Sequence, residues 1–115
     1  MRHRHKRHLR GGADRRRKEL RALASALVLY ERIETTGARA RIAKSAVEKL
    51  ITRGKNPGLA TIRLLRRDLP RNAVKKITEV LSPRYQNRPG GYTRIWHAGK
   101  FKDGTAKVIL ELVKE

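Results

Sequence analysis

The sequence contains no cysteine, which excludes a disulfide framework, a thiolate zinc site and a cysteine nucleophile. Aromatic residues are scarce, at 4% of the 115 residues, and only ten residues are acidic. No apolar run approaches the roughly 18 residues of a membrane-spanning helix. The N-terminal segment also lacks the apolar stretch that a secretory signal requires. We therefore expect a mature chain without a membrane span, and a reducing compartment fits its composition.

Positive charge dominates what is present. Thirty Lys and Arg against ten Asp and Glu give a formal net charge of +20. A compact protein with that charge repels itself unless counterions or a polyanion surround it. Nucleic acid is therefore the first candidate partner and an anionic membrane the second. The length fits one small domain with a modest core.

The first 18 residues, MRHRHKRHLRGGADRRRK, form the most basic segment, with nine Lys or Arg, three His and one Asp. Such a segment cannot bury enough apolar surface to fold alone, so we predict an extended arm over residues 1–18. Guanidinium groups bind phosphate through two hydrogen bonds and stack on bases, which favours a polyanion-binding arm over a solubilising tail. The candidate RNA contacts of the arm are Arg2, His3, Arg4, Lys6, Arg7, His8, Arg10, Arg15, Arg16, Arg17 and Lys18.

Hydrophobic periodicity predicts a single α+β domain over residues 19–115. Helical spacing begins near residue 20 and returns near 38, near 59 and after Pro70. Residues 92–98 and 105–113 alternate as strands, with a hairpin turn expected at Asp103-Gly104. Because a two-stranded hairpin is marginal alone, we expect a third strand from residues 31–36. The predicted fold therefore has about four helices and a small two- to three-stranded sheet, preceded by the arm.

Local signals predict where the helices begin and end. Gly54 is expected to stop the second helix, Asn56 to cap the third, and Pro83 to close the fourth. The third helix is expected to turn its apolar residues inward and its Arg residues outward. The inward residues are Leu59, Ile62, Leu65 and Leu69, and the outward residues are Arg63, Arg66 and Arg67. The core stripe of the fourth helix comprises Ala73, Val74, Ile77, Val80 and Leu81.

Residues 84–94, RYQNRPGGYTR, form the most informative interior stretch. Consecutive glycines let backbone amides approach a phosphate closely. Tyrosines can stack on unpaired bases, although Tyr92 is equally compatible with the core. Trp96, beside apolar neighbours, is expected to pack and not to stack. The candidate RNA contacts of this stretch are Arg84, Tyr85, Arg88, Gly90, Gly91, Tyr92 and Arg94.

Catalytic and metal sites have little support. His3, His5 and His8 are closely spaced, but neighbouring Arg and Lys repel a cation and no carboxylate or thiolate completes the set. His97 has no obvious carboxylate partner nearby, and no phosphate-binding glycine motif occurs. We therefore predict no enzyme, no cofactor and no bound metal.

Several motifs, in order, resemble one bacterial family. MRHR at the start, RIETT followed by ARA and VEKLIT, and above all PRYQNRPGGYTRI before a terminal ELV are similar to bacterial large-subunit ribosomal protein seventeen. The similarity runs from about Leu20 to Val113. The departure is in the arm, which matches the family in charge but differs in detail after its first three residues. The resemblance maps the start of a basic helix onto Thr35, Thr36, Arg39 and Arg41, and the exposed face of that helix adds Lys44.

This resemblance implies an α+β structural protein of the cytoplasmic ribosome that binds 23S-type ribosomal RNA near the nascent-peptide exit. Its implied partners are that RNA and neighbouring large-subunit proteins, with no membrane, small-molecule substrate or second copy of itself. A DNA-binding nucleoid or regulatory protein is the alternative, but the cations are spread over an arm, two helices and a loop and not over one recognition helix. A membrane-surface role would require exposed large apolar residues on one helix face.

Overall fold

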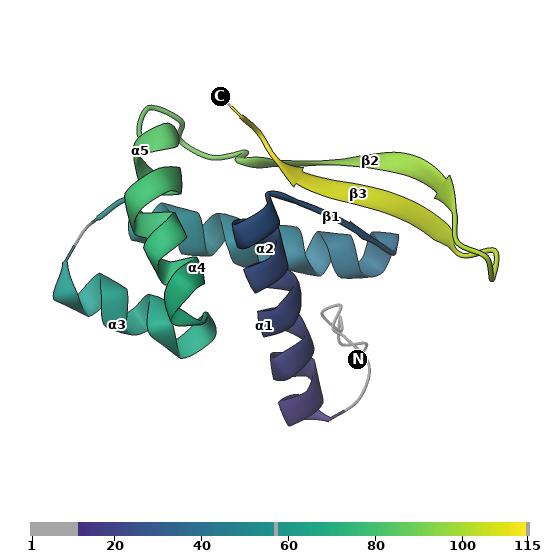
Figure 1. The fold of residues 1–115 in the computed structure, drawn as a ribbon, viewed down its shortest axis with the longest axis horizontal. Coiled ribbons are helices and arrows are strands. Elements are labelled where there is room, and N and C mark those ends of the chain that lie inside the picture. The colour runs from purple at the N-terminus through teal and green to yellow at the C-terminus, as the bar shows by residue number, and fades with distance from the viewer. Residues whose placement is uncertain (1–11, 57, 115) are drawn as a thin grey trace, which may run out of the picture.

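The computed structural model describes residues 12–56 and 58–114 as an α+β fold (Figure 1). Residues 1–11, most of the expected arm, lie outside the described part. The elements are α1 (Ala13–Tyr30), β1 (Arg32–Thr35), α2 (Gly37–Gly54), α3 (Leu59–Asp68), α4 (Arg71–Lys76), the π-helical η1 (Ile77–Leu81), α5 (Ser82–Arg84), β2 (Thr93–Lys100) and β3 (Ala106–Leu112). Since α4, η1 and α5 follow one another without a break, the expected four helices and small sheet are confirmed.

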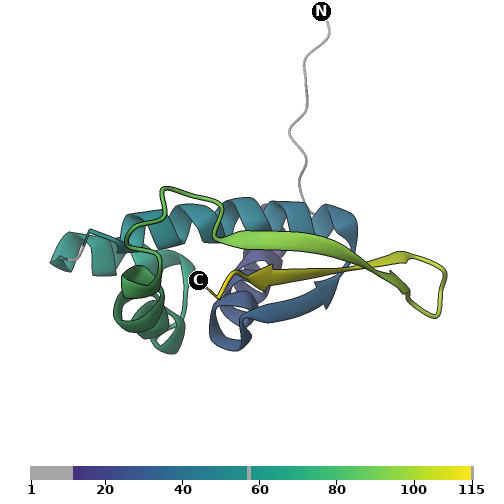
Figure 2. The same cartoon turned by 90° about the horizontal axis from the view of Figure 1, so that it is seen from above.

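The sheet is antiparallel with strand order β1-β3-β2, so the predicted third strand is confirmed. Leu110 of β3 lies opposite both Ile33 of β1 and Ile95 of β2, and this row packs on the core. The predicted turn lies between β2 and β3, where Gly104 has a φ of +89°. Figure 2 shows the β2–β3 hairpin projecting past the end of α2.

The core lies between one face of the sheet and the helices. Helices α1 and α2 cross beneath the strands, and the α4–α5 segment packs beside them (Figure 1). Gly54 is essential to this packing, because a Cβ there would lie 2.5 Å from Ile77 Cγ2. Helix α2 does end at Gly54 as predicted, but the residue is buried against η1 and allows that element to approach closely.

The expected cap of the third helix was wrong. Helix α3 begins at Leu59, and its N-cap is Gly58 in an extended conformation. Asn56 lies earlier, where its backbone oxygen accepts a hydrogen bond of 2.7 Å from Thr61 Oγ1. Only the C-terminal half of α3 is inserted into the core: Leu65 and Leu69 are buried. Leu59 and Ile62, also predicted inward, are exposed because the N-terminal half of the helix lies at the periphery.

The fourth helix was predicted to end at Pro83, but the last helical residue is Arg84. The π-helical turn η1 shifts the hydrogen-bond pattern before Pro83, which then occupies the first turn of a new segment, where a missing N–H is tolerated. The extra residue in the π turn also rotates the inward face. Val80, predicted in the core, is 42% exposed, whereas Leu81 is fully buried.

The first helix begins earlier than the predicted domain boundary at residue 18. Helix α1 starts at Ala13, with Asp14 in its first turn, where a carboxylate stabilises the helix dipole. Residues 15–18 are therefore helical and not part of an extended arm. The apolar stripe of α1 that packs on the core stabilises the helix, which then extends back through the basic residues that precede the stripe.

Candidate nucleic-acid interface

A groove of about 740 Å³ opens between α1, α2 and the C-terminal end of α3. Its wall carries seven cationic and two acidic side chains, so the groove has a large excess of positive charge. A concave surface lined by one sign of charge focuses the electrostatic field and attracts a polyanion. The cations are Arg17, Lys18, Arg21, Arg41, Lys49, Arg53 and Arg67, and the acids are Asp14 and Asp68.

The spacing of the cations explains why they share one groove. On α2, Arg41, Ser45, Lys49 and Arg53 follow one another at intervals of four residues and therefore form one ridge of the helix. The buried stripe of the same helix, which includes Val47 and Ile51, fixes its rotation on the core. None of the seven groove cations forms an ion pair with a carboxylate of residues 12–56 or 58–114. Their charge is therefore available to an external anion.

The predicted contacts near the start of α2 are only partly brought into this groove. Arg41 lines it, but Arg39 forms a 2.9 Å ion pair with Glu19, which links α2 to α1. Lys44 is half-buried and lies outside the groove lining. Thr36 is the N-cap residue of α2, and its side chain makes no capping hydrogen bond.

The predicted contacts of the basic N-terminal segment divide in the same way. Arg17 and Lys18 line the groove from α1. Arg15 and Arg16 belong to the first turn of α1 and do not line it. The remaining candidates, Arg2, His3, Arg4, Lys6, Arg7, His8 and Arg10, lie outside the described residues.

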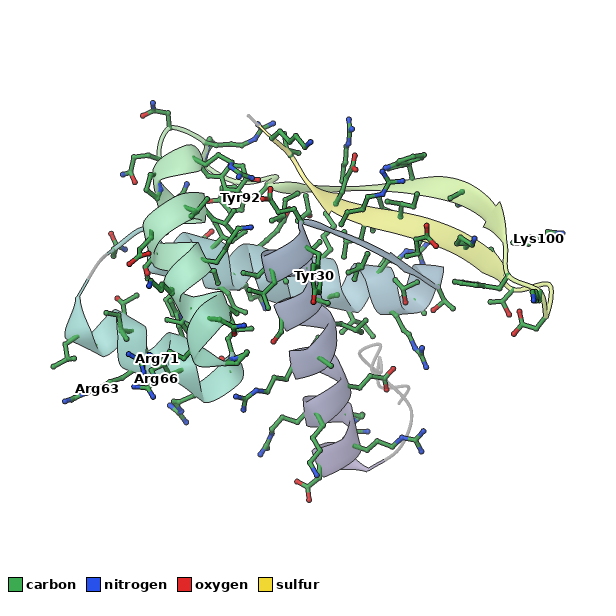
Figure 3. All side chains as sticks on the ribbon, viewed as in Figure 1. Tyr30, Arg63, Arg66, Arg71, Tyr92 and Lys100 are labelled. Carbon is green, nitrogen blue, oxygen red and sulfur yellow. The ribbon has the colours of Figure 1, made fainter. Side chains whose placement is uncertain are left out.

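The two tyrosines of residues 84–94 are buried, which contradicts the expected base stacking of Tyr85 and agrees with the core alternative for Tyr92. Tyr85 and Tyr92 have no exposed surface, and their ring centroids are 5.0 Å apart. The hydroxyl of Tyr85 donates to the backbone oxygen of Val113, and the hydroxyl of Tyr92 lies 3.1 Å from Thr52 Oγ1. Aromatic rings with satisfied hydroxyls are favourable in a core. Their ring contact joins the end of α5 to the residue before β2; Figure 3 labels Tyr92.

Arg84 was also predicted to bind RNA, but its guanidinium is engaged within the protein. It forms two hydrogen bonds with Glu31, which also accepts a 3.0 Å hydrogen bond from Lys76 Nζ. The hydrogen bond from Arg84, reinforced by Lys76, lowers the pKa of Glu31 to about 2. Glu31 ends α1 with a φ of +64°, so the cluster ties that end of the helix to α4 and α5.

The loop before β2 keeps the accessible backbone that the glycine pair predicted. A Cβ at Gly90 or Gly91 would meet no atom within 4 Å, and Gly91 has a φ of +65°. Arg88 is half-buried, and its backbone oxygen accepts a hydrogen bond from Lys55 Nζ. Arg94 pairs with Glu111, yet its side chain remains 69% exposed.

Trp96, expected to pack and not to stack on a base, lies on the outer face of the sheet, where it packs against Arg32. It is 41% exposed because none of the helices in residues 12–56 and 58–114 covers that face, and the Arg32 guanidinium lies 5.4 Å from its ring centroid. The described residues contain no group of three or more His, Asp or Glu that could hold a metal. His3, His5 and His8 lie outside them. Within residues 12–56 and 58–114, no helix is both long and apolar enough to cross a membrane.

Of the groove cations, the sequence predictions included Arg17, Lys18 and Arg41 but not Arg21, Lys49 or Arg53. The four-residue interval from Arg41 was a usable signal, because it places all three α2 cations on one ridge. Arg67 could not be assigned to this groove from sequence. Its position depends on how α3 folds back beside α2.

Comparison with known proteins gives a consistent family. The family model described as ribosomal protein L17 matches residues 19–113. A Thermodesulfovibrio yellowstonii protein named large ribosomal subunit protein bL17 is 42% identical over 98% of this chain and 87% of its own length. Relatives of the same name from Staphylococcus epidermidis and Staphylococcus aureus are 43% and 42% identical, over 88% of this chain and 93% of their own.

Proposed function

This chain belongs to the ribosomal protein L17 family, whose members are structural proteins of the large ribosomal subunit, and we propose that it binds and organises 23S-type ribosomal RNA there. As a ribosomal protein of this family it acts in the cytoplasm and is not an enzyme. Its proposed partners are large-subunit RNA and adjacent large-subunit proteins. Its proposed place is near the nascent-peptide exit, which the motif resemblance implies.

The observation that carries the RNA-binding proposal is the cationic groove between α1, α2 and α3. Seven Lys and Arg side chains there have no carboxylate partner among the described residues. Phosphate neutralisation by such side chains supplies most of the sequence-independent affinity of RNA-binding proteins. The basic residues 2–10 precede α1, whose cations line one wall, so a basic arm would extend the same contact.

No observation favours the DNA-binding alternative. In helix-turn-helix proteins, one recognition helix supplies the contacts that read the major groove. Here the exposed cations are shared among three helices that form a concave surface. Such a surface fits the curved backbone of folded RNA better than a single groove of duplex DNA.

Sedimentation of a lysate through a high-salt sucrose gradient tests the proposal. We expect the protein to migrate with the large subunit. A second gradient after nuclease digestion of the subunits should release it, since the RNA holds it there. Migration at the top of the first gradient, or with chromosomal DNA, would refute the proposed function.

A further inference from the structure

A second groove, of about 750 Å³, lies on the other side of α3, between that helix and the α4–η1 segment. It shares none of its lining residues with the cationic groove described above. Its lining combines two apolar, three cationic and two neutral polar residues with one carboxylate. Its lining consists of Ile62, Arg66, Arg71, Asn72, Val74, Lys75, Thr78 and Glu79.

The floor and one edge of this groove are apolar and accessible. Ile62 is 38% exposed and lines the groove, and Leu59, one turn earlier on the same flank of α3, is 65% exposed. The hydroxyl of Thr78 already donates to the backbone oxygens of Val74 and Lys75, at 3.1 and 3.2 Å. The groove therefore offers an apolar surface with few unsatisfied donors at its base.

The rim, in contrast, is strongly cationic. Arg66, Arg71 and Lys75 supply its cations, and Arg63, which does not line the groove, lies at the same end of the molecule (Figure 3). None of these four pairs with a carboxylate in the described parts of the chain. Glu79 is the one acid in the lining. A ligand that complements this groove needs negative charge at its edges and an apolar group at its centre.

We propose that this groove, named here the α3–α4 groove, docks a segment of a neighbouring large-subunit protein in which carboxylates flank one or more large apolar side chains. The inference rests on the proposed ribosomal function and identifies the surface that meets protein. Protein interfaces combine apolar anchors at the centre with a charged rim, which is the arrangement seen here.

RNA fits this surface less well than an acidic peptide. Phosphates packed against Ile62 and Leu59 would lose hydration without gaining a hydrogen bond. The groove lining contains no aromatic ring on which an unpaired base could stack, so only the guanidinium groups of Arg66 and Arg71 offer a stacking plane. The cationic groove on the other side of α3, where cations predominate, is the better RNA surface.

Site-specific photocrosslinking within assembled subunits tests the proposal. A benzophenone amino acid replaces Ile62 in one variant and Leu64 in another, and both variants are purified in large subunits before irradiation. Leu64 is a matched control because it lies on the same helix, is 40% exposed and does not line the groove. We expect position 62 to crosslink to an acidic segment of one large-subunit protein, mapped by mass spectrometry. Crosslinking to RNA alone, or no crosslink specific to position 62, would overturn the proposal.

A charge substitution at the same pair of positions gives a second readout. Ile62→Glu places a carboxylate opposite the acidic partner. The amount of this variant retained in large subunits at high salt should therefore fall by about tenfold, as for an interface anchor. Leu64→Glu should be retained like the unmodified protein, and both variants should bind isolated ribosomal RNA equally. Equal retention of the two variants would overturn the docking proposal. Failure of the unmodified protein to enter subunits would instead refute the proposed function.

Discussion

Removing two cations from one ridge of the cationic groove tests how the protein holds RNA. The double variant Arg41→Ala/Arg53→Ala removes two groove cations that have no carboxylate partner among the described residues. Both side chains are exposed, and alanine is the best helix former, so the free energy of unfolding should not fall. Any change in binding then reports lost phosphate contacts.

The size of the effect follows from counterion release. If each of the seven groove cations neutralises one phosphate, log affinity falls with log salt with a slope of about −5 to −6. Loss of two contacts makes the slope shallower by ~1.4 to 1.8. Raising the salt from 50 to 200 mM should therefore weaken the variant's affinity by a factor about tenfold smaller than for the unmodified protein. At low salt the variant should bind more weakly than the unmodified protein.

Titration of the RNA fragment that the protein protects in nuclease-treated subunits gives these slopes directly. The matched control is Lys102→Ala/Lys114→Ala, which removes two exposed cations outside the groove. We expect the control to keep the slope of the unmodified protein to within about half a unit. An unchanged slope in the groove variant, or equal changes in both variants, would refute phosphate binding in the groove.

Three further substitutions test the fold that positions the groove. The pKa of Glu31 is lowered from 4.5 to about 2, so its carboxylate stabilises the fold above pH 4.5 and loses this effect as the pH falls to about 2. Glu31→Gln should therefore remove ~1–2 kcal/mol from the pH dependence of the free energy of unfolding, measured by urea unfolding. Gly54→Ala should destabilise by ~1–3 kcal/mol in the same assay because its Cβ would meet Ile77, whereas Gly37→Ala, with nothing within 4 Å, should not. Gly91→Val should lose ~1–2 kcal/mol through strain at φ +65°, and a loss of equal size in Gly90→Val would contradict that cause.

Much of the fold could be predicted because local signals and burial agree. The apolar stripe of α2, the Asp103-Gly104 turn and the apolar positions Val108, Leu110 and Leu112 of β3 each predict an element, and all three strand residues are buried. The π turn could not be predicted, because its extra residue satisfies tertiary contacts of Leu81 and Tyr85 that no short window contains. Its consequence for Val80 was missed for the same reason.

The sequence predicted that the protein has a cationic binding surface, but it did not predict which residues form that surface. Charge composition and arginine preference indicated a polyanion surface, which depends on counts and not on geometry. Which cations act together depends on partners elsewhere in the fold: Arg84 pairs with Glu31 across 53 residues, and Arg39 with Glu19. The burial of Tyr85 was missed, and that of Tyr92 left open, because both depend on the approach of α5 to β2, which no spacing in residues 84–94 reveals.

Directed hydroxyl-radical probing from inside the cationic groove tests RNA binding there most directly. Because the chain has no cysteine, Ser45→Cys introduces a single thiol on the groove wall to which an iron chelate can be attached. In assembled large subunits, radicals from this position should cleave one compact region of the 23S-type RNA strongly. Cleavage no stronger than that by the untethered chelate would contradict RNA binding in the groove.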